Sequence, residues 1–398
     1  MALLNPMSKN VLEYFRVIIC LIAGILFSLY LHLTASGSSL HYNSQIWLKI
    51  FNFHKDIYPY NFRIFQTHAV SVLHNISGWP LKESFFVIQY LLAFLTGLFF
   101  YKLLKKLEFS SNWSLLGVSM LIFSLPMAAA FFEPIHTYDD FWMYGFTVLT
   151  FTAIIDRRWL LSALFFTLGC FAREQMLLFF PVLLAVAWGD RKETNLRRTV
   201  SLLLLPLIVY GSYYLFMYEP SNPKRWSLIT YNFADSARAA DSTISIWNAF
   251  GFVWIPAIIG AFKIWYGRQE RIESILFKGA VMIVPVTLAL GLFLTLARET
   301  RIFFPPFIFV IPLAVYAIRD DWSSYRHIRS AWFWTIGLCA AGFSIYLGIL
   351  LANILWPQFD YREAVKLRQG FAGANIGLAL LYLLFLSYTR LKMRNPLE

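Results

Sequence analysis

The sequence is poor in charged residues, because Asp, Glu, Lys and Arg make up 14% of its 398 residues while hydrophobic residues make up 59%. A soluble domain carries about 25% charged residues, so this composition argues against a soluble domain. Cysteine is also scarce: Cys20, Cys170 and Cys339 lie far apart inside apolar runs, and none belongs to a Cys-x-x-Cys pair. Neither a disulfide framework nor a cysteine-based zinc site is therefore indicated.

What the chain does contain is a series of apolar runs, with Lys and Arg gathered in short segments between them. This pattern predicts an all-α, polytopic membrane protein with about twelve membrane segments, folded as one multi-pass domain over residues 1–398. The net charge of +12 marks the loops that the positive-inside rule places in the cytoplasm, so it indicates topology and not a nucleic-acid partner. Both termini are expected in the cytoplasm, and the first run, residues 17–33, is expected to stay as a span because no small-residue cleavage site follows it.

This topology places five segments outside, at about residues 35–84, 133–140, 219–251, 297–301 and 356–370. The first external segment contains two apolar-aromatic stretches, residues 46–53 and 62–73, which are too short or too polar to span and suit helices lying in the membrane interface. The third span is expected at about residues 115–132. Residues 158–190 are too few for two full spans of about 20 residues each, so they predict a hairpin of two short helices with Arg173 and Glu174 at its apex.

Residues 133–140, with the sequence EPIHTYDD, place three carboxylates and one imidazole between two apolar runs. Carboxylates close to hydrocarbon are costly, so such a cluster indicates a functional site. Asp139 or Asp140 could act as a general base toward a hydroxyl, or bind a divalent metal together with His136. The alternative is a helix N-cap, for which Thr137 or Asp139 is well suited.

Two Arg-Glu groups, Arg173-Glu174 and Arg298-Glu299, lie on the same predicted side of the membrane as this cluster. Arg298 and Arg301 are three residues apart, so on a helix they share a face, and two guanidinium groups suit a phosphate or pyrophosphate. Structural ion pairs between helices are the alternative for both groups. The tripeptide Ala-Arg-Glu occurs at residues 172–174 and 297–299, followed each time by Phe-Phe-Pro; an internal duplication and coincidence both remain open.

The layout as a whole resembles the GT-C superfold of membrane glycosyltransferases. The shared features are about a dozen spans, a large first external loop with interfacial helices, acidic residues at external span ends, short re-entrant spans and outer arginines. The group Tyr138-Asp139-Asp140 and the two Arg-Glu groups also resemble patterns in relatives of that superfold. One departure is clear: the family usually has its catalytic carboxylate just after the first span, whereas residues 33–45 contain no acidic residue here.

The resemblance implies transfer of a sugar, with inversion, from a polyprenyl-phosphate-linked donor to a saccharide, lipid or protein acceptor on the extracytoplasmic side. It implies a bacterial inner membrane, or the ER membrane in a eukaryote. The residues it assigns are Asp139, Asp140 or Asp56 as catalytic base, Arg63, Arg173, Arg298 and Arg301 as phosphate ligands, and His136, Tyr138, Glu174 and Glu299 in supporting roles. No cofactor is indicated, apart from the divalent metal already named as an option.

A transporter or flippase for a lipid-linked saccharide, or for another anion, is the alternative function. In that case the same arginines would bind the substrate, and the short spans would be broken helices near the middle of the membrane. The cytoplasmic halves of most spans are apolar, which favours access from one side only and therefore the enzyme. A purely structural subunit of an envelope complex has no feature in its favour.

Overall fold

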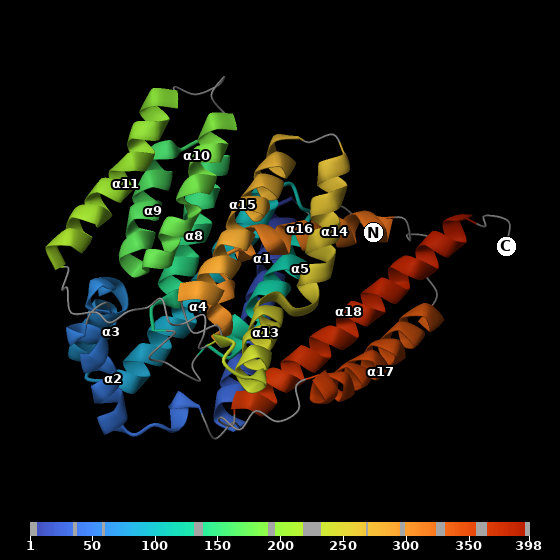
Figure 1. Cartoon of the computed structure of the whole chain (residues 1–398), viewed down its shortest axis with the longest axis horizontal. Coiled ribbons are helices and arrows are strands. Elements are labelled where there is room, and N and C mark those ends of the chain that lie inside the picture. Colours follow the sequence, from blue (N-terminus) through green and yellow to red (C-terminus); the bar gives the residue numbers. More distant parts are fainter. Residues whose placement is uncertain are drawn as a thin grey trace. The chain divides into compact units, whose positions relative to one another are not determined.

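The computed structural model describes residues 6–34, 38–57, 60–130, 138–189, 196–217, 232–267, 270–294, 299–323, 331–355 and 364–394. These residues form helices joined by short turns, and no strand occurs among them, as the predicted all-α class requires (Figure 1). The chain divides into two compact units. Unit 1 comprises Met1–Phe123, Met127–Lys224 and Glu270–Thr287, and unit 2 comprises Ser124–Pro126, Arg225–Gln269 and Leu288–Glu398. The single membrane domain stays a prediction.

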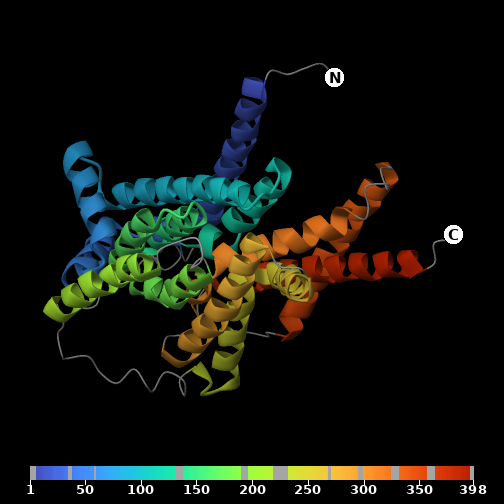
Figure 2. The same ribbon diagram turned by 90° about the horizontal axis from the view of Figure 1, so that it is seen from above.

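Unit 1 begins with one long helix and two shorter ones. Its helices in chain order are α1 (Pro6–Thr34), η1 (Ser39–His41), α2 (Ser44–Asp56), η2 (Tyr60–Phe62), α3 (Ile64–Ser77), α4 (Leu81–Lys106), α5 (Ser111–Ile122), α8 (Asp140–Ile155), α9 (Trp159–Ala172), η3 (Glu174–Phe179), α10 (Phe180–Gly189), α11 (Leu196–Met217) and most of α15 (Arg271–Leu294). Helix α1 packs against α4 and α5, where Val17 and Leu21 are almost fully buried (Figure 2).

Helix α8 is the centre of unit 1, since it packs against both α4 and α9 (Figure 1). It is apolar on all sides, and Tyr144 and Phe151 are among its buried residues, as expected for a helix surrounded by others. The chain turns sharply after α8 because Arg157 adopts a left-handed conformation with φ 58°. The Arg158 N–H then donates to the carbonyl of Ala153 at 2.8 Å, which closes the helix end and directs α9 back along α8.

The predicted hairpin in residues 158–190 is confirmed as two short helical stretches, α9 and then η3 with α10, which meet at Arg173 and Glu174. The two interfacial stretches predicted in the first external segment also form helices, α2 and α3. The segment predicted as the third span, residues 115–132, is not one continuous helix. Helix α5 ends at Ile122 and the short α6 (Leu125–Ala128) begins three residues later, because Pro126 has no N–H with which to continue the α-helical ladder of α5.

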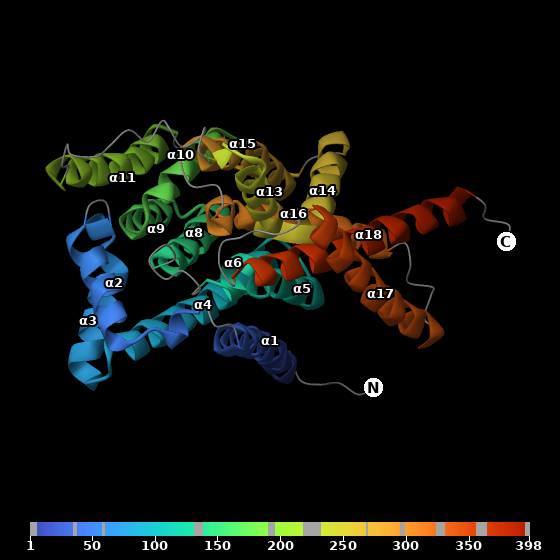
Figure 3. The ribbon, with the colours of Figure 1, turned by 60° about the horizontal axis from the view of Figure 1, so that its bottom comes forward.

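Unit 2 contains a long C-terminal hairpin of two helices. The elements of unit 2 are α13 (Ser236–Phe250), η5 (Gly251–Val253), α14 (Trp254–Tyr266), η6 (Thr300–Phe303), α16 (Phe307–Ser323), α17 (Ala331–Leu355) and α18 (Ala364–Arg394). Helices α17 and α18 run antiparallel and very close together (Figure 3), since a Cβ added at Gly348 would lie 2.0 Å from the carbonyl oxygen of Gly373. Part of the predicted external segment 219–251 is helical, because α13 lies within it.

Five helices in the described part of the chain are long and apolar enough to cross a membrane: Val11–Thr34, Leu81–Lys106, Arg238–Tyr266, Arg271–Phe293 and Leu367–Ser387. Shorter apolar helices accompany them, at Ser111–Ile122, Asp140–Ile155, Trp159–Ala172, Glu174–Gly189, Leu202–Phe216 and Gly342–Leu355. These helices are consistent with an integral membrane protein. The number of about twelve segments and the cytoplasmic termini stay predictions.

Candidate functional site

Two adjacent carboxylates are buried where α8 begins. Asp139 occupies the N-cap position and Asp140 is the first helical residue, and the two are 1% and 3% exposed. The positive end of the helix dipole favours negative charge at this place. The Asp139 side chain makes no capping hydrogen bond, which removes the contact that a simple capping role requires. Thr137, the other capping candidate, lies outside the described residues.

Asp140 forms an ion pair with Arg173, through Oδ1 of the carboxylate and Nη1 of the guanidinium. Arg173 is 4% exposed and lies at the junction of α9 and η3, where its extended backbone, with φ −162° and ψ 133°, ends the α-helix. The break in the hairpin therefore places a guanidinium beside the first turn of α8. This contact joins two segments that the sequence analysis singled out separately.

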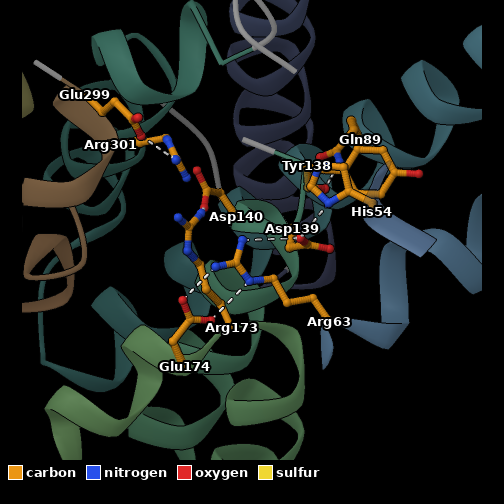
Figure 4. Close-up of polar contacts among 10 residues, drawn as sticks. All are labelled: His54, Arg63, Gln89, Tyr138, Asp139, Asp140, Arg173, Glu174, Glu299 and Arg301. Atoms are coloured by element: carbon orange, nitrogen blue, oxygen red, sulfur yellow. Dashed lines mark hydrogen bonds and ion pairs between the residues drawn. The ribbon is translucent and has the colours of Figure 1, made fainter. Parts of the chain in front are cut away.

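Arg63 connects the other two carboxylates of the cluster (Figure 4). It directly precedes α3, is 6% exposed, and binds Glu174 with two hydrogen bonds, Nε to Oε2 at 3.1 Å and Nη2 to Oε1 at 2.6 Å. Its Nη1 also lies 3.8 Å from Oδ2 of Asp139. Burial alone would lower the pKa of Arg63, but the carboxylates of Glu174 and Asp139 raise it above its usual range. The guanidinium therefore stays charged.

The cluster thus contains three carboxylates, Asp139, Asp140 and Glu174, and two guanidinium groups, Arg63 and Arg173. Removing charges from water costs several kcal/mol per ion, so a buried group of this size persists only because its members are paired. Glu174 differs from the others in that its side chain is 43% exposed. Among the three carboxylates, the one that makes the shortest contacts with Arg63 is therefore also the most exposed.

His54, Tyr138 and Gln89 form a second layer around Asp139 (Figure 4). His54 comes from α2, and its Nδ1 lies 3.7 Å from Oδ2 of Asp139. Its ring stacks on Tyr138 with a centroid distance of 3.9 Å, and Gln89 of α4 donates to the Tyr138 carbonyl at 2.7 Å. Burial raises the pKa of the Tyr138 phenol, and Asp139 raises it further, so the phenol stays neutral.

The sequence analysis placed Arg63, Tyr138, Asp139, Asp140, Arg173 and Glu174 in or beside the site, and the structure brings these six residues together. His54 also lies in the predicted first external segment, but the sequence analysis gave it no role. Gln89 was missed altogether, because a glutamine inside an apolar run gives no signal until its partner is known. The aromatic residues Phe53 and Tyr60, which lie near His54 in the sequence, could have drawn attention to this histidine.

Of the remaining candidates, Asp56, Glu299 and Arg301 are among the described residues, and His136 and Arg298 are not. Asp56 is exposed at the last position of α2 and is not one of the residues joined by the contacts above. Glu299 and Arg301 belong to unit 2, where Arg301 Nη2 lies 2.5 Å from Glu299 Oε2 and each side chain is 10% exposed. His136 and Arg298 are not among the described residues, so their predicted roles stay untested.

Metal binding was left open by the sequence. Within the described ranges, no group of three or more His, Cys, Asp or Glu side chains is arranged to hold a metal ion. His136, which was the suggested partner of Asp139 or Asp140 in such a site, lies outside those ranges. The divalent metal therefore stays an untested option.

Comparison with known proteins identifies a likeness of fold. No family model matches the sequence, and no curated protein matches it. The crystal structure of the oligosaccharyltransferase of Archaeoglobus fulgidus in the apo form superposes with a TM-score of 0.51 and 12% sequence identity. The match covers 91% of this chain and 56% of that one, so this protein spans little more than half the length of its structural neighbour. The fold thus resembles that of an oligosaccharyltransferase.

Proposed function

We propose that this protein is a membrane glycosyltransferase of the GT-C type. In this proposal it transfers a sugar from a polyprenyl-phosphate-linked donor to an acceptor on the extracytoplasmic side of the membrane. The observation that carries the proposal is the buried cluster at the start of α8, where Arg63 and Arg173 hold the carboxylates of Asp139 and Asp140. The likeness to an oligosaccharyltransferase supports glycosyl transfer as the class of reaction.

The proposed reaction begins with proton transfer from the acceptor hydroxyl to a carboxylate. The acceptor oxygen attacks the anomeric carbon from the face opposite the lipid phosphate, the bond from this carbon to the phosphate oxygen breaks, and the phosphate leaves with the electron pair. Asp139 is the better base, because Oδ1 of Asp140 is already engaged by Arg173, while the contacts of Asp139 with His54 and Arg63 are longer. Asp56, exposed at the end of α2, is the weaker candidate.

The leaving phosphate is proposed to bind the arginines, and charge stabilisation there would supply the largest part of the rate. Arg63 and Arg173 are paired with the carboxylates of Glu174 and Asp140, so a phosphate must take over at least one of these contacts. Glu174 is the partner most open to replacement, because its side chain is the exposed one and its two-point contact with Arg63 is the geometry that a phosphate would also make. Arg298 and Arg301 are proposed as further ligands, and Glu299 and His136 as supporting residues.

A transporter or flippase for a lipid-linked saccharide remains the second candidate, and one observation favours it. The helical hairpin is broken at Arg173 and Glu174, and transporters use broken helices with charged or polar groups to bind substrate. In that case the arginines would bind the anionic substrate while it moves across the membrane. No glycosidic bond would be broken.

The two functions are separated by incubating the purified protein with a polyprenyl-phosphate-linked sugar and a set of acceptors. The enzyme proposal predicts that glycosylated acceptor and free lipid phosphate appear in equal amounts, and that the double variant Asp139→Asn with Asp140→Asn forms neither. A parallel experiment in vesicles follows movement of the lipid-linked sugar between leaflets. Movement without any consumption of donor would replace the enzyme proposal by the transporter.

A further inference from the structure

His54 is held in a rigid aromatic setting at the C-terminal end of α2. Its imidazole stacks on the Tyr138 ring, with a centroid distance of 3.9 Å and an angle of 15° between the planes. The rings of Phe53 and Tyr60 make edge-to-face contacts with the imidazole, with centroid distances of 5.8 Å and 5.1 Å. The other side of Tyr138 stacks on Phe85 of α4 at 5.2 Å. These contacts fix the plane of the imidazole in a residue that is only 1% exposed.

The ring is oriented so that Nδ1 faces Asp139. The distance from Nδ1 to Oδ2 is 3.7 Å, which is longer than a hydrogen bond. In ligand-free proteins the hydrogen bonds of catalytic groups are often long and shorten when the substrate binds. Arg63 approaches the same oxygen at 3.8 Å. Because both groups contact Oδ2, they help to orient the carboxylate and thereby Oδ1.

We propose that His54 is a positioning residue for Asp139. Its Nδ1–H holds Oδ2, so that Oδ1 is aimed at the acceptor hydroxyl, and Tyr138 serves as the platform that keeps the imidazole in place. This inference rests on the proposed glycosyl transfer and on Asp139 as its base. In this proposal His54 contacts neither substrate nor leaving group, and its effect passes through Asp139.

Two substitutions separate positioning from packing. His54→Phe keeps an aromatic ring on Tyr138 but removes the N–H, whereas His54→Asn removes the ring but keeps an N–H donor near the place of Nδ1. Positioning predicts that His54→Phe lowers kcat by about 10- to 100-fold, the usual cost of removing a supporting partner of a functional group, while donor affinity and thermal unfolding stay as in the parent. His54→Asn should recover most of the lost turnover.

The matched control is His68, an exposed histidine of the neighbouring helix α3. His68→Phe and His68→Asn should both keep the turnover of the parent. A further arm adds His54→Phe to Asp139→Asn: because His54 acts only through Asp139, the double variant should turn over no more slowly than Asp139→Asn alone. This arm keeps the test decisive if His54→Asn folds poorly.

The outcomes are distinct for this inference and for the proposed function. If Asp139→Asn is inactive while His54→Phe turns over like the parent, His54 has no positioning role and the proposed function stands. If His54→Asn folds and is as slow as His54→Phe, the donor at Nδ1 is not what matters and the inference is wrong. If the parent transfers no sugar from any donor, the proposed function fails, and this inference fails with it.

Discussion

A 3-10 helix accompanies each of the two Ala-Arg-Glu tripeptides in the described part of the chain. At residues 172–174 the tripeptide leads into the 3-10 helix η3 (Glu174–Phe179), and at residues 297–299 the described part leads into the 3-10 helix η6 (Thr300–Phe303). Phe-Phe-Pro follows each of them. A similar sequence therefore gives a similar turn in each unit, each before an apolar helix.

The ion pairs described for the two segments differ in their separation along the chain. In unit 1, Arg173 pairs with Asp140 and Glu174 pairs with Arg63, so this segment ties together the starts of α3 and α8. In unit 2, Glu299 pairs with Arg301, two residues further along the same turn. The ion pairs described for residues 173 and 174 thus join distant parts of the chain, whereas the ion pair described for residue 299 is local. For this reason we base the proposed function on unit 1.

The largest expected effect on stability comes from Arg173→Ala. This change leaves Asp140 buried without its guanidinium partner, and breaking a buried ion pair in this way costs about 3–5 kcal/mol. Arg301→Ala should cost less, because the ion pair described for it joins Glu299 in the same turn, which can adjust with it. Thermal or denaturant unfolding of both variants in the same detergent provides the measurement. Equal losses would mean that the two segments play similar structural roles.

Much of the local structure could be predicted from the sequence. The helices α2 and α3, the short hairpin at residues 158–190 and the charged start of α8 follow from segment length and from the placement of polar residues among apolar ones. The interruption of the helix between α5 and α6 was not predicted, because hydropathy alone does not register the effect of Pro126. The candidate site residues could also be predicted, because charged residues inside an apolar sequence are easily recognised.

The pairing of these residues could not be predicted. Arg63 and Glu174 are 111 positions apart, and nothing in either local sequence specifies the other as partner. The same holds for His54 and Gln89, which become part of the site only because α2 and α4 pack beside the turn before α8. Such contacts depend on tertiary packing, so a single sequence predicts the members of the site better than its geometry.

A second prediction asks whether the unit 2 segment nevertheless binds the donor. Arg298→Ala and Arg301→Ala should each weaken binding of a polyprenyl phosphate by about 1.5–3 kcal/mol, the range for hydrogen bonds to charged groups. Arg329→Ala, in a predicted cytoplasmic turn, should leave binding unchanged. Titration of the lipid phosphate against each purified variant is the measurement. Equal weakening in all three variants would remove the case for a phosphate site at residues 298–301.

The smallest effect is expected for the pair between Lys106 and Asp156, which lies at other helix ends of unit 1. Their side chains are 37% and 26% exposed, so solvent screens the pair and Lys106→Ala should cost at most about 1 kcal/mol of stability. Unfolding under the conditions used for Arg173→Ala measures it. If Lys106→Ala lost as much stability as Arg173→Ala, burial would not explain a larger contribution of the Arg173 ion pair to stability.

The central claim is that a carboxylate at the start of α8 takes the proton of the acceptor hydroxyl. It is tested most directly by comparing Asp139→Asn and Asp140→Asn with the parent in glycosyl transfer, with donor binding measured in parallel. We predict that Asp139→Asn lowers turnover by at least about 10²-fold, the lower end for general-base catalysis, with donor binding nearly unchanged, and that Asp140→Asn has the smaller effect on turnover. Parental turnover in both variants would contradict the account, because Asn can cap a helix nearly as well as Asp but cannot accept the proton.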